Sequence, residues 1–126
     1  MNREVNDLSF DDVILIANGV LPEVVIRDAG LIESAVARPQ TTVFGDLAYP
    51  TLMLQAAALL HSLARNHPLV DGNKRIAWSS ARVFLLMSDV DLDYDIDSAE
   101  ELVLGVARGE LDVQHIAQAL ESWVAQ

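Results

Sequence analysis

The chain has 126 residues, of which 52% are hydrophobic, and a length of this size favours a single domain over residues 1–126. Its formal net charge of -11 argues against direct binding to nucleic acid or to an anionic membrane, since both need a basic face. No apolar run approaches the roughly 20 residues that span a bilayer, the start lacks a secretory signal pattern, and the absence of cysteine fits a cytoplasmic protein.

Most of the chain is predicted to be helical. Ser9 can cap a first helix that has Asp11 and Asp12 in its first turn, where the helix dipole favours negative charge. A second helix is expected over residues 29–37, and Pro39 should stop it because the residue before a proline avoids the helical region.

The middle of the chain contains the most apolar segment. Residues 40–44 are partly β-branched and lie between a proline and a glycine, which predicts an extended loop or a small hairpin. Residues 49–66 then form a long predicted helix with two adjacent apolar faces, and so broad a surface belongs at the centre of a domain. The helical pattern breaks over residues 67–72 and resumes at Asn73.

Two more helices are predicted near residues 99–108 and 113–125, with Asp112 as the cap of the second. The acidic segment before them, Asp89–Glu100, has oxygen ligands at several positions of an EF-hand calcium loop. However, Tyr94 stands where that loop needs glycine, and the alternating apolar residues fit an extended connection better. We therefore predict an extended connection and keep calcium binding as the alternative.

The break between the two central helices has residues suited to phosphate chemistry. Residues 67–75 read His-Pro-Leu-Val-Asp-Gly-Asn-Lys-Arg. The first N–H groups of a helix point outward and bind phosphate, and Gly72 allows a close approach. Lys74 and Arg75 add positive charge, while His67, as a neutral imidazole, can accept a hydroxyl proton.

Three other side chains complete this predicted site. Asp71 alone would repel phosphate, but it fits a role in holding Mg²⁺, which binds through one or two carboxylates and phosphate oxygens. Asn73 is a good helix cap and can also donate to phosphate. Arg65 supplies a third cation two residues before the histidine. The alternative for the whole segment is a structural loop followed by a capped helix.

The nine residues from His67 to Arg75 resemble the signature of the Fic/Doc superfamily, which reads His-Pro-Phe-x-Asp/Glu-Gly-Asn-Gly/Lys-Arg. Leu69 replaces the phenylalanine. Lys74 is typical of the death-on-curing (Doc) toxins, whereas nucleotidyl-transferring members have glycine there. Trp78 stands where those transferases have a second arginine, which also favours the Doc branch.

This resemblance implies an all-α fold, a compact Fic/Doc-type helical bundle around a central helix–loop–helix, with a short extended flap. It implies His67 as the base that deprotonates a target hydroxyl and Asp71 as the carboxylate on the Mg²⁺ side. The same resemblance assigns ATP binding to a group of residues around the loop, with Lys74 also catalytic: Arg65, Gly72, Asn73, Lys74 and Arg75. The flap that aligns a target peptide corresponds to five residues: Gln40, Thr41, Thr42, Val43 and Phe44.

The resemblance also implies a reaction and partners. Doc toxins transfer the γ-phosphate of ATP to elongation factor Tu and so stop translation, whereas their Fic relatives transfer AMP to a protein hydroxyl. A catalytically inactive binding scaffold is a further alternative. No glutamate of this chain precedes glycine or asparagine, so it lacks the inhibitory helix motif of many transferases. Inhibition is instead expected from a Phd-type antitoxin whose disordered tail folds on the toxin.

Overall fold

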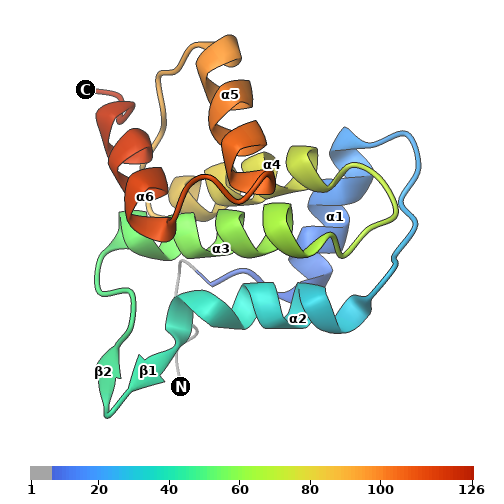
Figure 1. Ribbon diagram of the computed structural model, residues 1–126, viewed down its shortest axis with the longest axis horizontal. Coiled ribbons are helices and arrows are strands. Elements are labelled where there is room, and N and C mark those ends of the chain that lie inside the picture. The colour runs from blue at the N-terminus through green and yellow to red at the C-terminus, as the bar shows by residue number, and fades with distance from the viewer. Residues whose placement is uncertain (1–6) are drawn as a thin grey trace.

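The computed structural model describes residues 7–126 and confirms an all-α fold, with one small hairpin as the exception (Figure 1). The described helices are α1 (Phe10–Val20), α2 (Ala29–Ala37), the 3-10 helix η1 (Arg38–Gln40), α3 (Leu52–Asn66), α4 (Asn73–Leu86), α5 (Ile96–Ala107) and α6 (Val113–Ser122). The strands are β1 (Thr42–Val43) and β2 (Asp46–Leu47). No helix within residues 7–126 is both long and apolar enough to cross a membrane.

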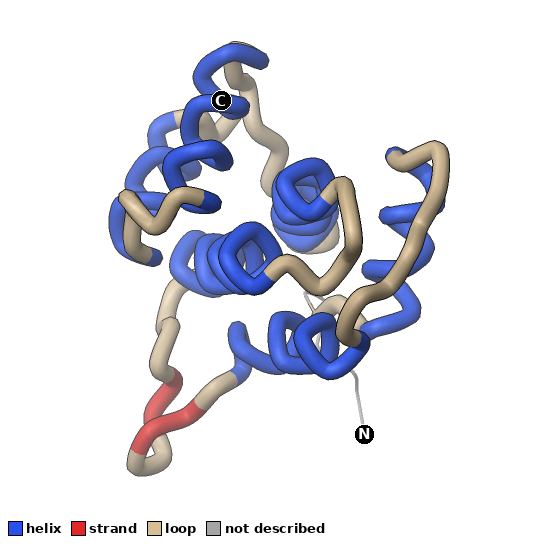
Figure 2. Tube along the Cα trace, turned by 45° about the vertical axis from the view of Figure 1, so that its right-hand side comes forward, coloured by secondary structure: helices blue, strands red, loops and turns tan. Residues whose placement is uncertain are grey.

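The long apolar helix α3 lies at the centre, as its two apolar faces predict. It packs against α2, α4, α5 and α6, and Figure 2 shows α3 and α4 side by side with α2 beneath them. Three consecutive alanines of α3 have no exposed surface, and small side chains of this kind let the neighbouring helices approach closely: Ala56, Ala57 and Ala58.

Side-chain caps fix the starts of α1, α3, α5 and α6. Ser9 accepts from the N–H of Asp12, whose carboxylate accepts from the N–H of Ser9, so the predicted cap of α1 is confirmed as a capping box. Asp112 caps α6 as predicted. The predicted start of α3 at residue 49 is wrong by three residues, because Thr51 caps the helix through the N–H of Leu54.

The acidic segment is an extended connection, as preferred from its alternation. Leu92 forms an isolated antiparallel bridge with Val124, which ends α6 at Ser122 and not at the predicted residue 125. The carboxylate of Asp91 is bound by Arg82 at 2.8 Å, and that of Asp95 caps α5. Because α5 begins inside the supposed calcium loop and Asp91, one of the loop's ligands, is bound by Arg82, the EF-hand alternative is not supported.

Residues 42–47 form a hairpin of two short strands joined by a two-residue turn, so the extended segment predicted at residues 40–44 overlaps this hairpin only in part. Its turn consists of Phe44 and Gly45, both with positive φ (51° and 87°). Phe44 is completely exposed, and Val43 and Leu47 are about half exposed. The hairpin precedes α3, whereas the loop at His67 follows it, so the two lie at opposite ends of this helix (Figure 1).

Candidate functional site

The site is built on the loop between α3 and α4. His67 ends α3 in the left-handed conformation (φ 52°, ψ 61°), which turns the chain sharply out of the helix. Its side chain is exposed, and its ring has no hydrogen-bond partner among the described residues. A histidine ring in this state is accessible to a hydroxyl group of another molecule.

Asn73 closes the loop from the inside. Its side-chain oxygen accepts from the N–H of Leu69 at 2.8 Å, and its amide nitrogen donates to the carbonyl of the same residue at 2.9 Å. Asn73 is buried and is the first residue of α4, so the N-cap is Gly72 and the expectation that Asn73 caps this helix is wrong. Its predicted contact with phosphate stays a prediction, and its visible role is to shape the loop.

A short segment after α1 binds the loop from the outside. The N–H of Val70 donates to the carbonyl of Val25 at 2.9 Å, and Ile26 pairs with Leu69 in an isolated antiparallel bridge. The N–H groups of residues 27 and 28 both donate to the carbonyl of Pro68. We call residues 25–28 the strap, because they run antiparallel to the loop and restrict its backbone.

Arg27, in this strap, has a contact that no local sequence pattern indicates. Its Nε donates to the carbonyl of His67 at 2.7 Å, and its Nη2 donates to the carbonyl of Asn66 at 2.8 Å. One guanidinium therefore binds the last two carbonyls at the end of α3. The sequence signal that could have found it is a lone arginine just before a predicted helix start, and this signal is weak.

The N-terminus of α4 forms the phosphate-facing part of the site. Gly72 has φ 90°, a left-handed value that favours glycine, and a Cβ there would lie 2.6 Å from the side chain of Leu21. Within the described chain, no carbonyl accepts from the N–H groups of residues 73–75. These donors and the helix dipole make an anion site whose first turn contains Lys74 and Arg75.

The two cations of this turn differ in their surroundings. Lys74 is exposed and makes no hydrogen bond or ion pair in the described part of the molecule. Arg75 donates to the carbonyl of Val20 over a long 3.3 Å, so it is only weakly held at the end of α1. Both side chains, and especially that of Lys74, are free to bind an anion.

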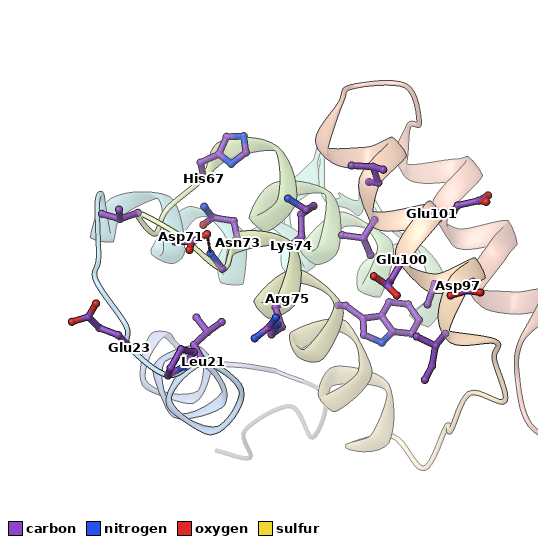
Figure 3. A pocket seen from close by; sticks show the side chains of 18 of the residues that line it. Leu21, Glu23, His67, Asp71, Asn73, Lys74, Arg75, Asp97, Glu100 and Glu101 are labelled. Atoms are coloured by element: carbon purple, nitrogen blue, oxygen red, sulfur yellow. Dashed lines mark hydrogen bonds between the residues drawn. The ribbon is translucent and has the colours of Figure 1, made fainter.

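These groups share one hollow of about 1290 Å³. Figure 3 shows His67, Asp71, Lys74 and Arg75 around the loop and the start of α4, with the carboxylate of Glu100 in α5 directed toward them. The opposite wall is formed by Trp78 and by residues of the acidic connection and α5: Tyr94, Ile96, Asp97, Glu100, Glu101 and Leu104. The site therefore has a cationic end and an acidic, partly apolar end.

Trp78 lines this hollow, at the position where the nucleotidyl-transferring relatives have an arginine. Its ring meets that of Tyr94 edge to face at 4.9 Å and that of Trp123 at 6.1 Å. Such aromatic pairs are stable in this geometry. The position is thus a rigid apolar surface and offers no guanidinium to a nucleotide.

Asp71 is the carboxylate nearest in sequence to the anion site at the N-terminus of α4. One of its oxygens accepts from the N–H of Gly72 at 2.9 Å, and the side chain is exposed at the rim of the hollow. Within residues 7–126 no group of three or more acidic or histidine side chains is arranged to hold a metal by itself. A single carboxylate fits Mg²⁺, which usually completes its shell with water and phosphate oxygens.

Arg65 is not brought together with the other predicted site residues. Its Nη1 donates to the carbonyl of Ala107 at 2.9 Å, and it lines a separate, smaller hollow with His61 and His115. There, burial first, followed by the guanidinium groups of Arg38 and Arg65, lowers the pKa of His61 below 6.5. Arg65 therefore lies outside the hollow of the other predicted phosphate-binding residues, and its role in binding ATP stays a prediction.

Comparison with known proteins gives consistent matches. Residues 4–85 match the family described as "Fic/DOC family". A protein named "Toxin Doc" from Mycolicibacterium smegmatis is 53% identical over 105 residues, which cover 82% of this chain and 81% of that protein. A protein named "Protein kinase doc" from Escherichia phage P1 is 33% identical over 95 residues, which cover 75% and 74% of the two chains.

Proposed function

Because the chain belongs to the Fic/DOC family and to its Doc branch, we propose that it is a toxin that transfers the γ-phosphate of ATP to a serine or threonine hydroxyl. The observation that carries this proposal is the shared hollow. A histidine ring without a partner lies at the same rim as the free amine of Lys74 and the open N–H groups of α4. A base and a triphosphate site are the two parts that such a reaction needs.

The chemistry assigns one role to each part. The ring of His67 accepts the hydroxyl proton, and the hydroxyl oxygen forms a bond to the γ-phosphorus. The bond from that phosphorus to the β–γ bridging oxygen breaks, and ADP leaves. The open N–H groups of residues 73–75 and the side chains of Lys74 and Arg75 would orient the phosphates, and Gly72, which has no side chain, lets them approach the backbone. Asp71 would hold Mg²⁺, which neutralises charge on the phosphate oxygens when bound.

Transfer of phosphate is favoured over transfer of AMP by two positions. Lys74 adds bulk and charge where glycine would leave space for a phosphate group, and Trp78 presents an aromatic ring where an arginine would fix the other end of the triphosphate. The printed name "Protein kinase doc" of the phage relative supports the same choice. AMP transfer is the second candidate, since the same base attacks whichever phosphorus lies in line.

The partners follow from the Doc branch. We propose elongation factor Tu, or another translation factor, as the target and a Phd-type antitoxin as the inhibitor. The acidic, partly apolar wall of α5 supports an inhibitor with a basic and apolar segment, since exposed Ile96 lies beside three carboxylates: Asp97, Glu100 and Glu101. Co-expression with the neighbouring open reading frame should restore growth and give a complex, and failure of both would contradict this partner.

Labelled ATP tests the reaction directly. The purified protein is incubated with a cell lysate and ATP labelled at the γ- or α-phosphate. Transfer of the γ label supports the proposal, and transfer of the α label supports the AMP alternative. His67→Ala should abolish transfer, whereas His115→Ala, a change of an exposed histidine outside the hollow, should not. If neither label is transferred and His67→Ala is equally toxic on expression, the chain is a binding scaffold.

A further inference from the structure

The backbone of His67 needs an external support. With φ 52°, it is one of three non-glycine residues with positive φ in the described chain. A side chain with a Cβ occupies this region at a steric cost, so the surrounding structure must hold it there. The position of the ring depends on this backbone, because the imidazole is attached to the same Cα.

Arg27 is placed to give that support. Its guanidinium binds the carbonyls of Asn66 and His67 with two short hydrogen bonds. Among the described residues, no other group donates to these two carbonyls from outside α3. The backbone N–H groups of the strap reach only Pro68, one residue further on. A planar fork across two adjacent carbonyls fixes their relative orientation, which a single donor does not.

The location also explains the choice of a cation. The two carbonyls are the last of α3, where the helix dipole places partial negative charge. Nε and Nη2 form one edge of the guanidinium, and both donate to these carbonyls, so this edge is not available to a phosphate. Arg27 also does not line the hollow that contains Lys74 and Arg75.

We propose that Arg27 is a positioning residue, which holds His67 in the left-handed conformation and so aims its ring at the hollow. The proposal rests on the function proposed above, in which that ring is the base. It adds a residue 40 positions away in the sequence, outside the signature, to the group on which the proton transfer depends.

Steady-state kinetics of γ-phosphate transfer test this role. Arg27→Ala should lower kcat by about 100-fold, the order of loss expected for a misplacement near 1 Å, and change the KM for ATP less than twofold. Arg27→Lys keeps the charge without the fork and should lose about tenfold. Arg108→Lys, a change of an exposed arginine outside both hollows, is the matched control. Ethylguanidinium at millimolar concentration should restore part of the rate of Arg27→Ala.

The outcomes separate positioning from other roles. Calorimetric titration with Mg·ATP gives the folded fraction of each variant, so a loss of kcat at full binding stoichiometry supports positioning. A raised KM with unchanged kcat would show a phosphate contact and overturn the proposal. A rate within twofold of wild type in Arg27→Ala would also overturn it. If Arg27→Ala does not fold, Arg27→Lys decides between these results.

A spectroscopic measurement keeps the inference independent of the reaction. If the wild-type protein transfers no label, the proposed function fails, but the backbone of His67 can still be measured. Its ¹³Cα and ¹³Cβ chemical shifts should have left-handed values in the wild type and lose them in Arg27→Lys. Unchanged shifts would show that the backbone hydrogen bonds of the strap set this conformation without the Arg27 side chain, and the proposal would be wrong.

Discussion

The two ends of α3 are built in opposite ways. At its C-terminal end, the loop at His67 is held by the strap, by the amide of Asn73 and by Arg27. At its N-terminal end, every residue of the hairpin 42–47 is exposed to solvent, and the side chain of Phe44 at its tip is fully exposed. The protein thus restricts the part that would do chemistry and leaves the part that would meet another protein accessible.

The distance between these ends has a consequence for substrates. A helix of 15 residues is about 22 Å long. A target segment paired with β1 would need roughly seven extended residues to bring a hydroxyl group to His67. The flap interpretation of residues 40–44 therefore stays a prediction, and it requires a long peptide or a large protein surface.

Replacing the base should have the largest effect. His67→Ala should lower γ-phosphate transfer by about 10²- to 10⁴-fold, the usual contribution of a general base. The circular dichroism spectrum should stay that of the wild type, because the side chain is exposed. Toxicity that persists at the wild-type level would mean that the ordered end of α3 does not serve catalysis.

Substitution of two cations distinguishes a side chain inside the hollow from one outside it. Lys74→Ala should weaken Mg·ATP binding by about 10- to 100-fold, because a charged hydrogen bond contributes about 1.5–3 kcal/mol. Arg65→Ala should change this affinity less than twofold, because its guanidinium binds the carbonyl of Ala107 beside another hollow. Calorimetry measures both. Equal losses would restore the interpretation that the signature and Arg65 act together.

A substitution at the start of α4 tests whether the loop backbone tolerates a side chain at Gly72. Gly72→Ala should lower the free energy of unfolding by about 1–3 kcal/mol, since it places a Cβ at φ 90° and against Leu21. Gly19→Ala is the matched control, because a Cβ there meets nothing within 4 Å. Urea denaturation gives both values. A Gly72 variant as stable as the control would mean that the loop tolerates more conformations than its contacts indicate.

The hairpin should show the smallest effect on stability. Phe44→Ser should change the free energy of unfolding by less than about 0.5 kcal/mol, because the ring is fully exposed. It should also leave Mg·ATP affinity unchanged while reducing modification of a protein target in a lysate. If the target is modified as fast as by the wild type, the accessible end of α3 has no part in recognition.

The sequence predicted helices well where local signals set their limits. The caps Ser9 and Asp112 are confirmed, because capping depends on residues three apart. The bounds of α2 are also confirmed, with Pro39 just beyond its end. The sequence did not show that Arg65 lies apart from the signature residues, and it missed the contact of Arg27. Sequence spacing says that an arginine is near a histidine, but it does not say which carbonyl the guanidinium reaches when the chain folds.

The same limit applies to Asn73. Its place in the signature suggested a contact with phosphate, whereas the structure shows its amide bound to both backbone groups of Leu69. A buried amide with such partners organises a loop, and the signature cannot distinguish this role from ligand binding. Short motifs therefore combine residues that act on a ligand with residues that shape the backbone around it.

The side chain of Leu21 fills the space where a Cβ on Gly72 would lie, and so the first quarter of the chain packs against the start of α4. A truncated protein that began at Ala29 would keep all nine signature residues and would lose this contact and the strap together. The smallest fragment worth expressing must therefore start before α1. A search of genomes by the signature alone would accept truncated sequences that lack the strap and Leu21, which support the conformation of the signature loop.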